Sequence, residues 1–230
     1  MRVDVAFTPG EEAAAHVGIV VDVIRATSSI AQALASGYER VLCCAEIEEA
    51  RLLRAELGDE AVVGGERQAV VVEGFDVGAS PREFAEAPKA KTLILTTTNG
   101  TRAILTAASR CDVVLLGSLL NVSAVARAAR RAGGDVAIIC SGFQGAFALD
   151  DAYCAGRIVE ALGGERSDAA IAAAVVSAAW PDPLQGLNAR TYGPPGLEAD
   201  IEFCAQVDLL DVAPVLSRMI GTAAEIRSEQ

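Results

Sequence analysis

The amino-acid sequence predicts an α/β protein with three layers, in which helices cover both faces of a mostly parallel, mixed β-sheet. Short runs rich in Val, Ile and Leu alternate with helical patterns along most of the 230 residues. The runs are almost continuously apolar, which is typical of strands buried on both faces. Such alternation folds into a parallel sheet with helices on both sides. The length fits one large domain or two small ones and is ample for a buried core, and we treat residues 1–230 as a single domain.

Seven segments have the apolar, β-branched composition of strands. In chain order they are "VDVAF" (3–7), "VGIVVDV" (17–23), "RVLCC" (40–44), "AVVGG" (61–65), "TLILTT" (92–97), "DVVLLG" (112–117) and "DVAIIC" (135–140). Six helical patterns lie between and after them: "TSSIAQALAS" (27–36), "EIEEARLLRAEL" (46–57), "TRAILTAAS" (101–109), "NVSAVARAARRA" (121–132), "LDDAYCAGRIVEAL" (149–162) and "SDAAIAAAVVSAAW" (167–180). Their order predicts repeated strand–helix units.

Two stretches break the alternation. Residues 66–91 form a long connection or a small excursion, and loops of this length in compact domains are often functional. Residues 181–200 are rich in Pro and Gly, and we favour a lid or the rim of a cleft there. The alternative is a linker to further helices at the end of the chain.

The chain is acidic, with 31 Asp and Glu against 19 Lys and Arg and a formal net charge of -12. Such a surface repels the phosphates of nucleic acids and anionic lipid heads, so we expect neither nucleic acid nor membrane as a partner. A small anionic substrate remains open, because screening at cellular salt limits fields to about 8 Å and local arginines then dominate.

The compartment we expect is the cytoplasm. The opening "MRVDVAFTPGEEAAA" lacks the basic and apolar regions of a signal peptide. The most apolar helical window, "AAIAAAVVSAAW", is too short for a membrane span. The six cysteines form no C-x-x-C pair, which is typical of reduced and mostly buried thiols. Zinc is disfavoured because His16 is the single histidine.

Polar residues gather where predicted strands turn into helices. Ligands of parallel sheets bind beyond the carboxyl ends of the strands, and helix N-termini favour anions. The corner "DVIRATSS" supplies Asp22, Arg25, Thr27, Ser28 and Ser29. The corner "TTTNGTR" supplies Thr97, Thr98, Asn99, Gly100, Thr101 and Arg102. The hydroxyls could instead serve only as helix caps, and Asp22 could pair with Arg25 or cap its helix.

Two further corners add carboxylates. "GGERQAVVVEGFDVGASP" supplies Glu66, Arg67 and Glu73, and "CSGFQGAFALDDAYCAG" supplies Asp150 and Asp151. Several carboxylates beside arginines suit Mg²⁺, which prefers oxygen ligands and brings substrate phosphates with it. Solvated loop charges, or acidic residues placed by the dipole of a helix, are the alternatives.

The sequence lacks the motifs of several known classes of enzyme. The chain has no G-x-G-x-x-G after a strand, no G-x-x-x-x-G-K-[ST] and no Cys-x5-Arg loop. His16 enters a strand and does not suit a hydrolase triad. An enzyme acting on anions would therefore use carboxylates, arginines and a metal.

At these corners the sequence resembles the 2-phosphosulfolactate phosphatases, the ComB family. The resemblance rests on "VVDVIRATSSIAQALASG", "GGERQAVVVEGFDVGASPREF", "LTTTNGTRAI", "SGFQGAFALDDAYCAG" and "DIEFCAQVDLLDVAPVL". It implies an α/β fold and Mg²⁺-dependent hydrolysis of 2-phosphosulfolactate to sulfolactate and phosphate, a step toward coenzyme M. The chain departs from the family pattern at 185–200, which has no histidine.

The resemblance also implies that most of these corner residues occupy motif positions, and we assign them roles. The catalytic residues we expect are Asp22, Arg25 and Arg102. Substrate binding is assigned to Thr27, Ser28, Arg67, Asn99, Gly100 and Thr101. The metal ligands we expect are Asp22, Glu66, Glu73 and Asp151.

The partner we expect is a small anionic phosphorylated substrate. Two alternative functions stay open: a phosphatase of this fold that acts on another small phospho-acid, and a non-catalytic module that binds phosphorylated metabolites. The sequence does not fix the oligomeric state, and a homodimer is one assembly that we allow for.

Overall fold

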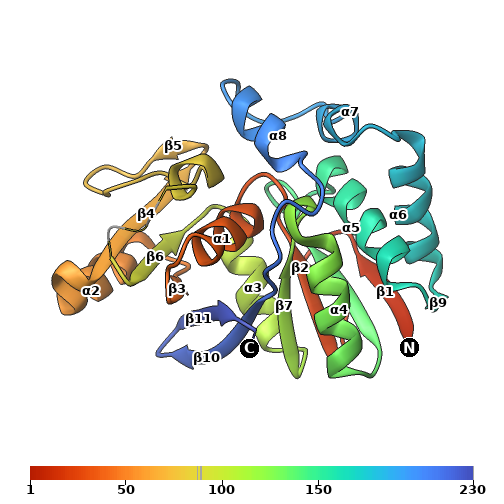
Figure 1. Cartoon of the computed structure of the whole chain (residues 1–230), viewed down its shortest axis with the longest axis horizontal. Coiled ribbons are helices and arrows are strands. Elements are labelled where there is room, and N and C mark those ends of the chain that lie inside the picture. The colour runs from red at the N-terminus through yellow and green to blue at the C-terminus, as the bar shows by residue number, and fades with distance from the viewer. Residues whose placement is uncertain (87, 89, 230) are drawn as a thin grey trace.

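The computed structural model describes residues 1–86, 88 and 90–229 of the chain. In this part of the chain, eleven strands form one sheet (Figure 1). The strand order is β5-β4-β6-β3-β11-β10-β7-β2-β8-β1-β9. Helices cover both faces, so the predicted three-layer α/β/α class with a mostly parallel, mixed sheet is confirmed.

The sheet contains two parallel blocks. One block is ordered β7-β2-β8-β1-β9 and comprises β1 (Arg2–Ala6), β2 (Val17–Val21), β7 (Val113–Gly117), β8 (Val136–Cys140) and β9 (Glu165–Arg166). The other is ordered β4-β6-β3 and comprises β3 (Arg40–Cys43), β4 (Ala61–Arg67) and β6 (Thr92–Thr96). All seven predicted strands are therefore present.

An antiparallel hairpin joins the two blocks. It consists of β10 (Pro214–Ile220) and β11 (Ala223–Ser228), and it lies between β7 and β3 (Figure 1). β11 pairs with β3 along three residues, whereas β10 meets β7 through the single pair Val215–Leu115. The alternative expectation for residues 181–200 is a linker to further helices at the end of the chain. This expectation is wrong, because after one short helix the chain continues into these two strands.

Each predicted helix is also present. The six are α1 (Ala26–Ala35), α2 (Ile47–Leu57), α3 (Gly100–Ala108), α4 (Val122–Ala132), α5 (Leu149–Leu162) and α6 (Asp168–Ala179). Buried residues of α1 and α3 pack on one face of the sheet, and those of α4, α5 and α6 pack on the other. A smaller apolar cluster joins α2 to β3, β4 and β6.

The central strand β2 explains why the strands read as uninterrupted apolar runs. Val17, Ile19 and Val21 point into the core beneath α4 and α5, whereas Val20 points into the core beneath α1 and α3. Every residue of β2 is buried. A strand covered on both faces has no position for a polar side chain, so its sequence shows no alternation.

The two irregular stretches contain short elements of their own. Residues 66–91 include β5 (Val70–Val71), which pairs with the end of β4, and a 3₁₀ turn at Pro81–Phe84. Residues 181–204 include α7 (Pro183–Asn188) and α8 (Glu198–Cys204). Both helices lie along one edge of the molecule (Figure 1).

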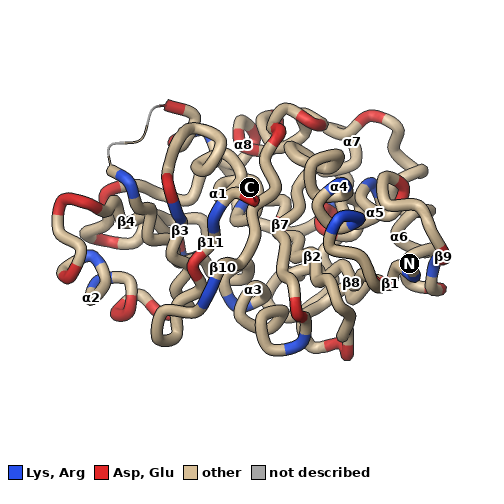
Figure 2. The backbone as a smooth tube through the Cα atoms, turned by 60° about the horizontal axis from the view of Figure 1, so that its bottom comes forward, with Lys and Arg blue, Asp and Glu red and all other residues tan. Residues whose placement is uncertain are grey.

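The six cysteines form no disulfide in the described part of the chain, and five of them are buried. No helix among the described residues combines the length and apolar character needed to cross a membrane. Acidic positions occur along the whole length of the molecule, from α2 to the chain near β9 (Figure 2).

The hairpin brings a buried carboxylate into the middle of the sheet. Glu225 of β11 is fully buried, and Arg218 Nε donates to its Oε2 at 2.8 Å, while Arg227 donates to Oε1. Arg40 Nη1 of β3 lies 3.9 Å from Oε2. Burial by itself would raise the pKa of Glu225, but the hydrogen bonds from Arg218 and Arg227 lower it below its usual value of 4.5.

Glu225→Gln should therefore destabilise the fold in a pH-dependent way. Because the folded pKa lies below the unfolded one, the carboxylate contributes stability above pH 4.5 and loses it as the pH falls through the folded pKa. We expect a loss of about 1–3 kcal/mol at pH 7, shrinking at lower pH. Urea denaturation at pH 7 and pH 3 measures it, with the exposed Glu202→Gln as control; an equal loss at both pH values would contradict the charge-based explanation.

Candidate active site

A cavity of about 310 Å³ lies where four strands end. Asp22 follows β2, Glu66 lies at the end of β4, Thr97 follows β6 and Ser141 follows β8, and all four line the cavity. The first turn of α5 supplies two further carboxylates, described below. The corners that the sequence singled out thus surround one space. A cavity of this size suits a small molecule.

Asp22 is a buried carboxylate with one oxygen left open. Ala26 N donates to its Oδ1 at 3.3 Å, and no residue of the described chain donates to Oδ2 within hydrogen-bond distance. The side chain is 7% exposed. Burial raises the pKa of Asp22 from 3.8 to about 6, and the charges of Asp150 and Glu66 add to this. The Ala26 N–H opposes the rise in pKa, and so does the nearby Ser141 hydroxyl, whose proton is donated to Asp151.

Asp151 ties two strand ends together. Val23 N donates to its Oδ1 at 2.9 Å, and Ser141 Oγ and Gly142 N donate to its Oδ2 at 2.9 and 3.0 Å. Val23 follows β2 and Ser141 follows β8. Burial, together with the charges of Asp150 and Asp22, raises the pKa of Asp151 well above its usual value. Its carboxylate therefore has a clear structural task.

The neighbouring Asp150 contacts two residues that follow α7, Arg190 and Tyr192. Tyr192 donates its hydroxyl proton to Asp150 Oδ1, and Arg190 Nη1 lies 3.4 Å from Oδ2. Burial raises the pKa of Asp150, while the Tyr192 hydrogen bond and the Arg190 charge act against that rise. The Tyr192 ring stacks on Phe143 with centroids 4.9 Å apart.

Arg190 and Tyr192 belong to residues 189–197, which we call the roof segment. Arg190, Tyr192, Pro194 and Leu197 line the cavity. The segment leads directly into α8. The preferred sequence-based interpretation of residues 181–200, a lid or cleft rim, agrees with this placement.

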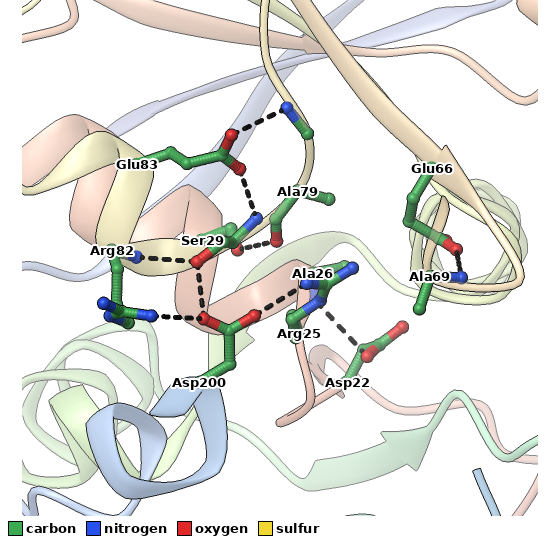
Figure 3. Close-up of polar contacts among 12 residues, drawn as sticks. Asp22, Arg25, Ala26, Ser29, Glu66, Ala69, Ala79, Arg82, Glu83 and Asp200 are labelled. Carbon is green, nitrogen blue, oxygen red and sulfur yellow. Dashed lines mark hydrogen bonds and ion pairs between the residues drawn. The ribbon is translucent and has the colours of Figure 1, made fainter. Parts of the chain in front are cut away.

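Arg25 enters the cavity at the start of α1 and is held from behind by Asp200 of α8. Arg25 Nη1 donates to Asp200 Oδ2 at 2.7 Å, and both side chains are about nine-tenths buried. Ser80 Oγ donates to the other oxygen at 2.6 Å, and Arg82 Nη1 lies 4.0 Å from it. Figure 3 shows Asp200 reaching from α8 toward both arginines. The contact fixes the Arg25 guanidinium in the lining of the cavity that Asp22 also lines.

Glu66 and the turn before α3 build a further part of the cavity wall. Thr98 donates to Glu66 Oε1 through its N–H at 2.8 Å and its hydroxyl at 3.0 Å, and Ala69 N donates to Oε2 at 2.7 Å. At Gly100, a Cβ would lie 2.6 Å from Asp22 Oδ2, so only glycine lets the two corners approach this closely.

The cavity holds more negative than positive charge. Four carboxylates line it, those of Asp22, Glu66, Asp150 and Asp151, against two guanidinium groups, those of Arg25 and Arg190. Like charges in a buried site disfavour ionisation of one another, which agrees with the raised carboxyl pKa values. Ionised carboxylates in such a site would repel a phosphate unless positive charge or protonation offsets them.

Comparison with known proteins identifies the family. The family model described as 2-phosphosulpholactate phosphatase matches residues 5–219. The chain belongs to the 2-phosphosulfolactate phosphatase family. A protein of Thermus thermophilus named "Probable 2-phosphosulfolactate phosphatase" is 42% identical over 97% of this chain and 98% of its own. Relatives with the same name in Symbiobacterium thermophilum and Gloeobacter violaceus are 39% and 40% identical over 91% and 93% of this chain, and over 94% of their own chains. Recognition from the corner motifs is thereby confirmed.

Two arginines assigned roles from the family motifs lie outside the cavity. Arg102 is on the exposed side of α3, where its Nη2 pairs with Glu46 at 3.2 Å and 65% of its side chain is accessible. Arg67 donates to the carbonyl oxygens of Glu66 and Ala45 and to Thr96 Oγ1. Arg67 therefore joins the ends of three strands and does not line the cavity.

The hydroxyls of the family motifs mostly bond the backbone or one another. Thr27 Oγ1 donates to the Asp22 carbonyl at 2.9 Å, and Ser28 Oγ donates to the Val23 carbonyl at 2.8 Å. Thr97 and Thr101 bond each other across the start of α3 through hydroxyl and N–H groups 3.0 to 3.1 Å apart. Within the described residues, neither α1 nor α3 has a hydrogen bond from the side chain of its N-cap residue, so these hydroxyls shape the corners and do not serve as N-caps. Asn99 lines the cavity and accepts a hydrogen bond from Gln144 N at 3.3 Å.

Three of the four carboxylates expected as metal ligands line the cavity, those of Asp22, Glu66 and Asp151. Glu73 is exposed on the loop after β5 and does not line the cavity. In the described part of the chain, no three Asp, Glu, His or Cys side chains lie close enough to hold a metal ion among them. Glu66 and Asp151 each already accept three hydrogen bonds, which leaves Asp22 Oδ2 as the open carboxylate oxygen.

Sequence reasoning assigned no role to four residues that shape this family site. These are Asp150, Arg190, Tyr192 and Asp200, and each makes its key contact with a partner 40 or more residues away in the chain. The Pro- and Gly-rich composition of 181–200 indicated the segment that carries Arg190 and Tyr192 but gave no reason to select those residues. Asp200 is the first residue of the family segment "DIEFCAQVDLLDVAPVL", to which sequence reasoning assigned no role.

Asp22→Asn should stabilise the fold of this family member. Because the folded pKa of about 6 lies above the unfolded 3.8, the contribution of Asp22 is fully present below pH 3.8 and is lost as the pH rises through 6. The neutral amide avoids that loss, so we expect the variant to be about 1–3 kcal/mol more stable at pH 8 and equal to the parent at pH 4. Urea denaturation in EDTA measures this, and equal stabilities at pH 8 would contradict the burial of a strained charge.

Asp151→Ala should act in the opposite direction. The change leaves Val23 N, Ser141 Oγ and Gly142 N buried without their acceptor. We expect a loss of about 3–5 kcal/mol in the free energy of unfolding. Thermal and urea unfolding measure it, with the exposed Asp168→Ala as a matched control. A loss as small as that of the control would show that the strand ends do not depend on this carboxylate.

Proposed function

We propose that the protein is a Mg²⁺-dependent phosphatase that hydrolyses 2-phosphosulfolactate to sulfolactate and inorganic phosphate. The proposal is carried by one observation: in this family member Asp22, a buried carboxylate with an open oxygen, lines the same cavity as an arginine that Asp200 holds in place. By the same resemblance we propose a role in coenzyme M biosynthesis. The free cysteines favour the cytoplasm as the compartment.

The cavity suits a small ester with several negative charges. Arg25 is positioned by Asp200, so its guanidinium is held in place before a ligand arrives. We assign Arg25 to the phosphoryl group, since a planar guanidinium matches phosphate oxygens. α3 begins at Gly100, which lies against Asp22, and the preceding Asn99 lines the cavity. Backbone N–H groups at such a helix start favour an anion.

The residues also fit magnesium, held in the way this ion usually binds. Mg²⁺ takes one or two carboxylates and completes its shell with water and substrate phosphate, so three protein ligands are not required. Asp22 would hold it through Oδ2, with Glu66 on the adjoining wall. When bound, the ion supplies the positive charge that four carboxylates beside a phosphate require.

Asp22 is the residue on which turnover depends most. Two routes remain open for it, direct attack on phosphorus and activation of a water molecule, and both need its ionised form. Arg25 stabilises the charge that develops on the phosphoryl oxygens. Asp151 and Gly100 contribute by placing Asp22, the first through the strand ends and the second through the close approach of α3.

Phosphate release from 2-phosphosulfolactate tests the proposal. We expect release with Mg²⁺ and none with EDTA, and a loss of at least about 100-fold in kcat for Asp22→Asn. Arg131→Ala is the control, because this exposed arginine pairs with Glu229 far from the cavity. A panel of other phospho-acids tests the alternative substrates. Tight binding without any release would support the non-catalytic module instead and would contradict the proposal.

A further inference from the structure

The roof segment carries a second buried arginine that the phosphoryl chemistry does not use. Arg190 lines the cavity, and only 10% of its side chain is exposed. In the described part of the chain its hydrogen-bond partner is Asp150 alone, at 3.4 Å. A guanidinium carries five N–H donors, so this single long contact leaves most of them open.

Arg190 differs from Arg25 in how firmly it is held. Arg25 makes a 2.7 Å contact to Asp200, whose other oxygen is fixed by Ser80. Arg190 lies farther from Asp150, and the other oxygen of Asp150 is taken by the Tyr192 hydroxyl. Asp150 thus offsets part of the cost of burying the Arg190 charge without engaging the guanidinium on both of its N–H edges.

The surroundings of Arg190 fix its place in the cavity. Tyr192 stacks on Phe143, and Arg190 packs beside Gly193, where a Cβ would lie 3.2 Å from its Nη1. Asp22, Asp150 and Arg190 line the same cavity of about 310 Å³, and Asp150 is the carboxylate in contact with Arg190. Arg190 and the Asp22 corner can therefore meet two groups of one small ligand.

We propose that Arg190 determines specificity by binding a second acidic group, a carboxylate or a sulfonate, of a small phosphate monoester. A planar fork with open N–H donors matches the oxygens of either group. The cavity then selects phosphorylated hydroxy-acids over phosphate esters of neutral alcohols. This inference rests on the proposed function, since it takes the Asp22 and Arg25 corner as the phosphoryl site.

Two ligands that each fill one end of the cavity test the inference. Sulfolactate carries the acidic groups without phosphate, and inorganic phosphate carries the phosphoryl oxygens alone. Calorimetric titration of the full chain with Mg²⁺ compares the parent, Arg190→Gln and the surface control Arg131→Gln. We expect Arg190→Gln to weaken sulfolactate binding about 10- to 100-fold, the range for a charge-assisted hydrogen bond, and phosphate binding less than about threefold. The control should change neither.

Arg190→Lys guards against a folding artefact, because it keeps the charge beside Asp150 and removes only the fork. We expect it to bind sulfolactate with an affinity between those of the parent and Arg190→Gln. Unchanged sulfolactate binding, an equal loss for both ligands, or a parent that does not bind sulfolactate would each overturn the inference. Phosphate release is a separate readout: no turnover alongside the expected binding pattern would refute the phosphatase and leave the acid-binding role of Arg190 in place.

Discussion

The Asp151 carboxylate is the contact on which the geometry of the site depends. It accepts hydrogen bonds from Val23 N, Ser141 Oγ and Gly142 N, so it joins the chain after β2 to the chain after β8. Asp22 directly precedes Val23. The position of the open oxygen in the cavity therefore depends on a neighbouring acidic residue that is itself fully engaged. Three donors converging on one carboxylate make this a rigid support.

That support places several carboxyl groups in one buried space, and the arrangement works against stability. The pKa values of Asp22, Asp150 and Asp151 are all raised by burial, which means that each ionised form is disfavoured in the folded state. The Arg25 guanidinium, in contrast, is paired closely with the Asp200 carboxylate. Carboxyl groups with strongly perturbed pKa values are typical of functional sites, where a bound ligand can supply the missing positive charge.

The sheet and the corners could be predicted because both leave local signals. A strand such as Val17–Val21 is buried on both faces and is therefore wholly apolar, and the polar run that follows it marks the edge of the sheet. The β10–β11 hairpin left no such signal, since its central position is made tolerable by Arg218 and Arg227 around Glu225. Because buried strands are recognised by apolar runs, a central strand that contains charged residues is not predicted from its sequence.

Side-chain direction was the harder part of the site. Thr101 and Arg102 are neighbours at the start of α3, yet one is buried against Thr97 and the other points outward to Glu46. That difference depends on the rotation of the helix against the sheet, which the sequence does not specify. Arg25 and Asp200 are 175 residues apart, and their contact depends on how α8 returns over the sheet. No local pattern encodes such a pair.

The place of the β10–β11 hairpin has a consequence for the protein as it is being made. Its strands are the last of the sheet to be synthesised, yet they lie between the two parallel blocks. The blocks can form early on a ribosome, but each then has an unpaired edge facing the position that the hairpin will fill. Exposed edges of this kind invite pairing with other chains. Both edges therefore stay unpaired until residues 214–228 have left the ribosome, and this hairpin completes the sheet.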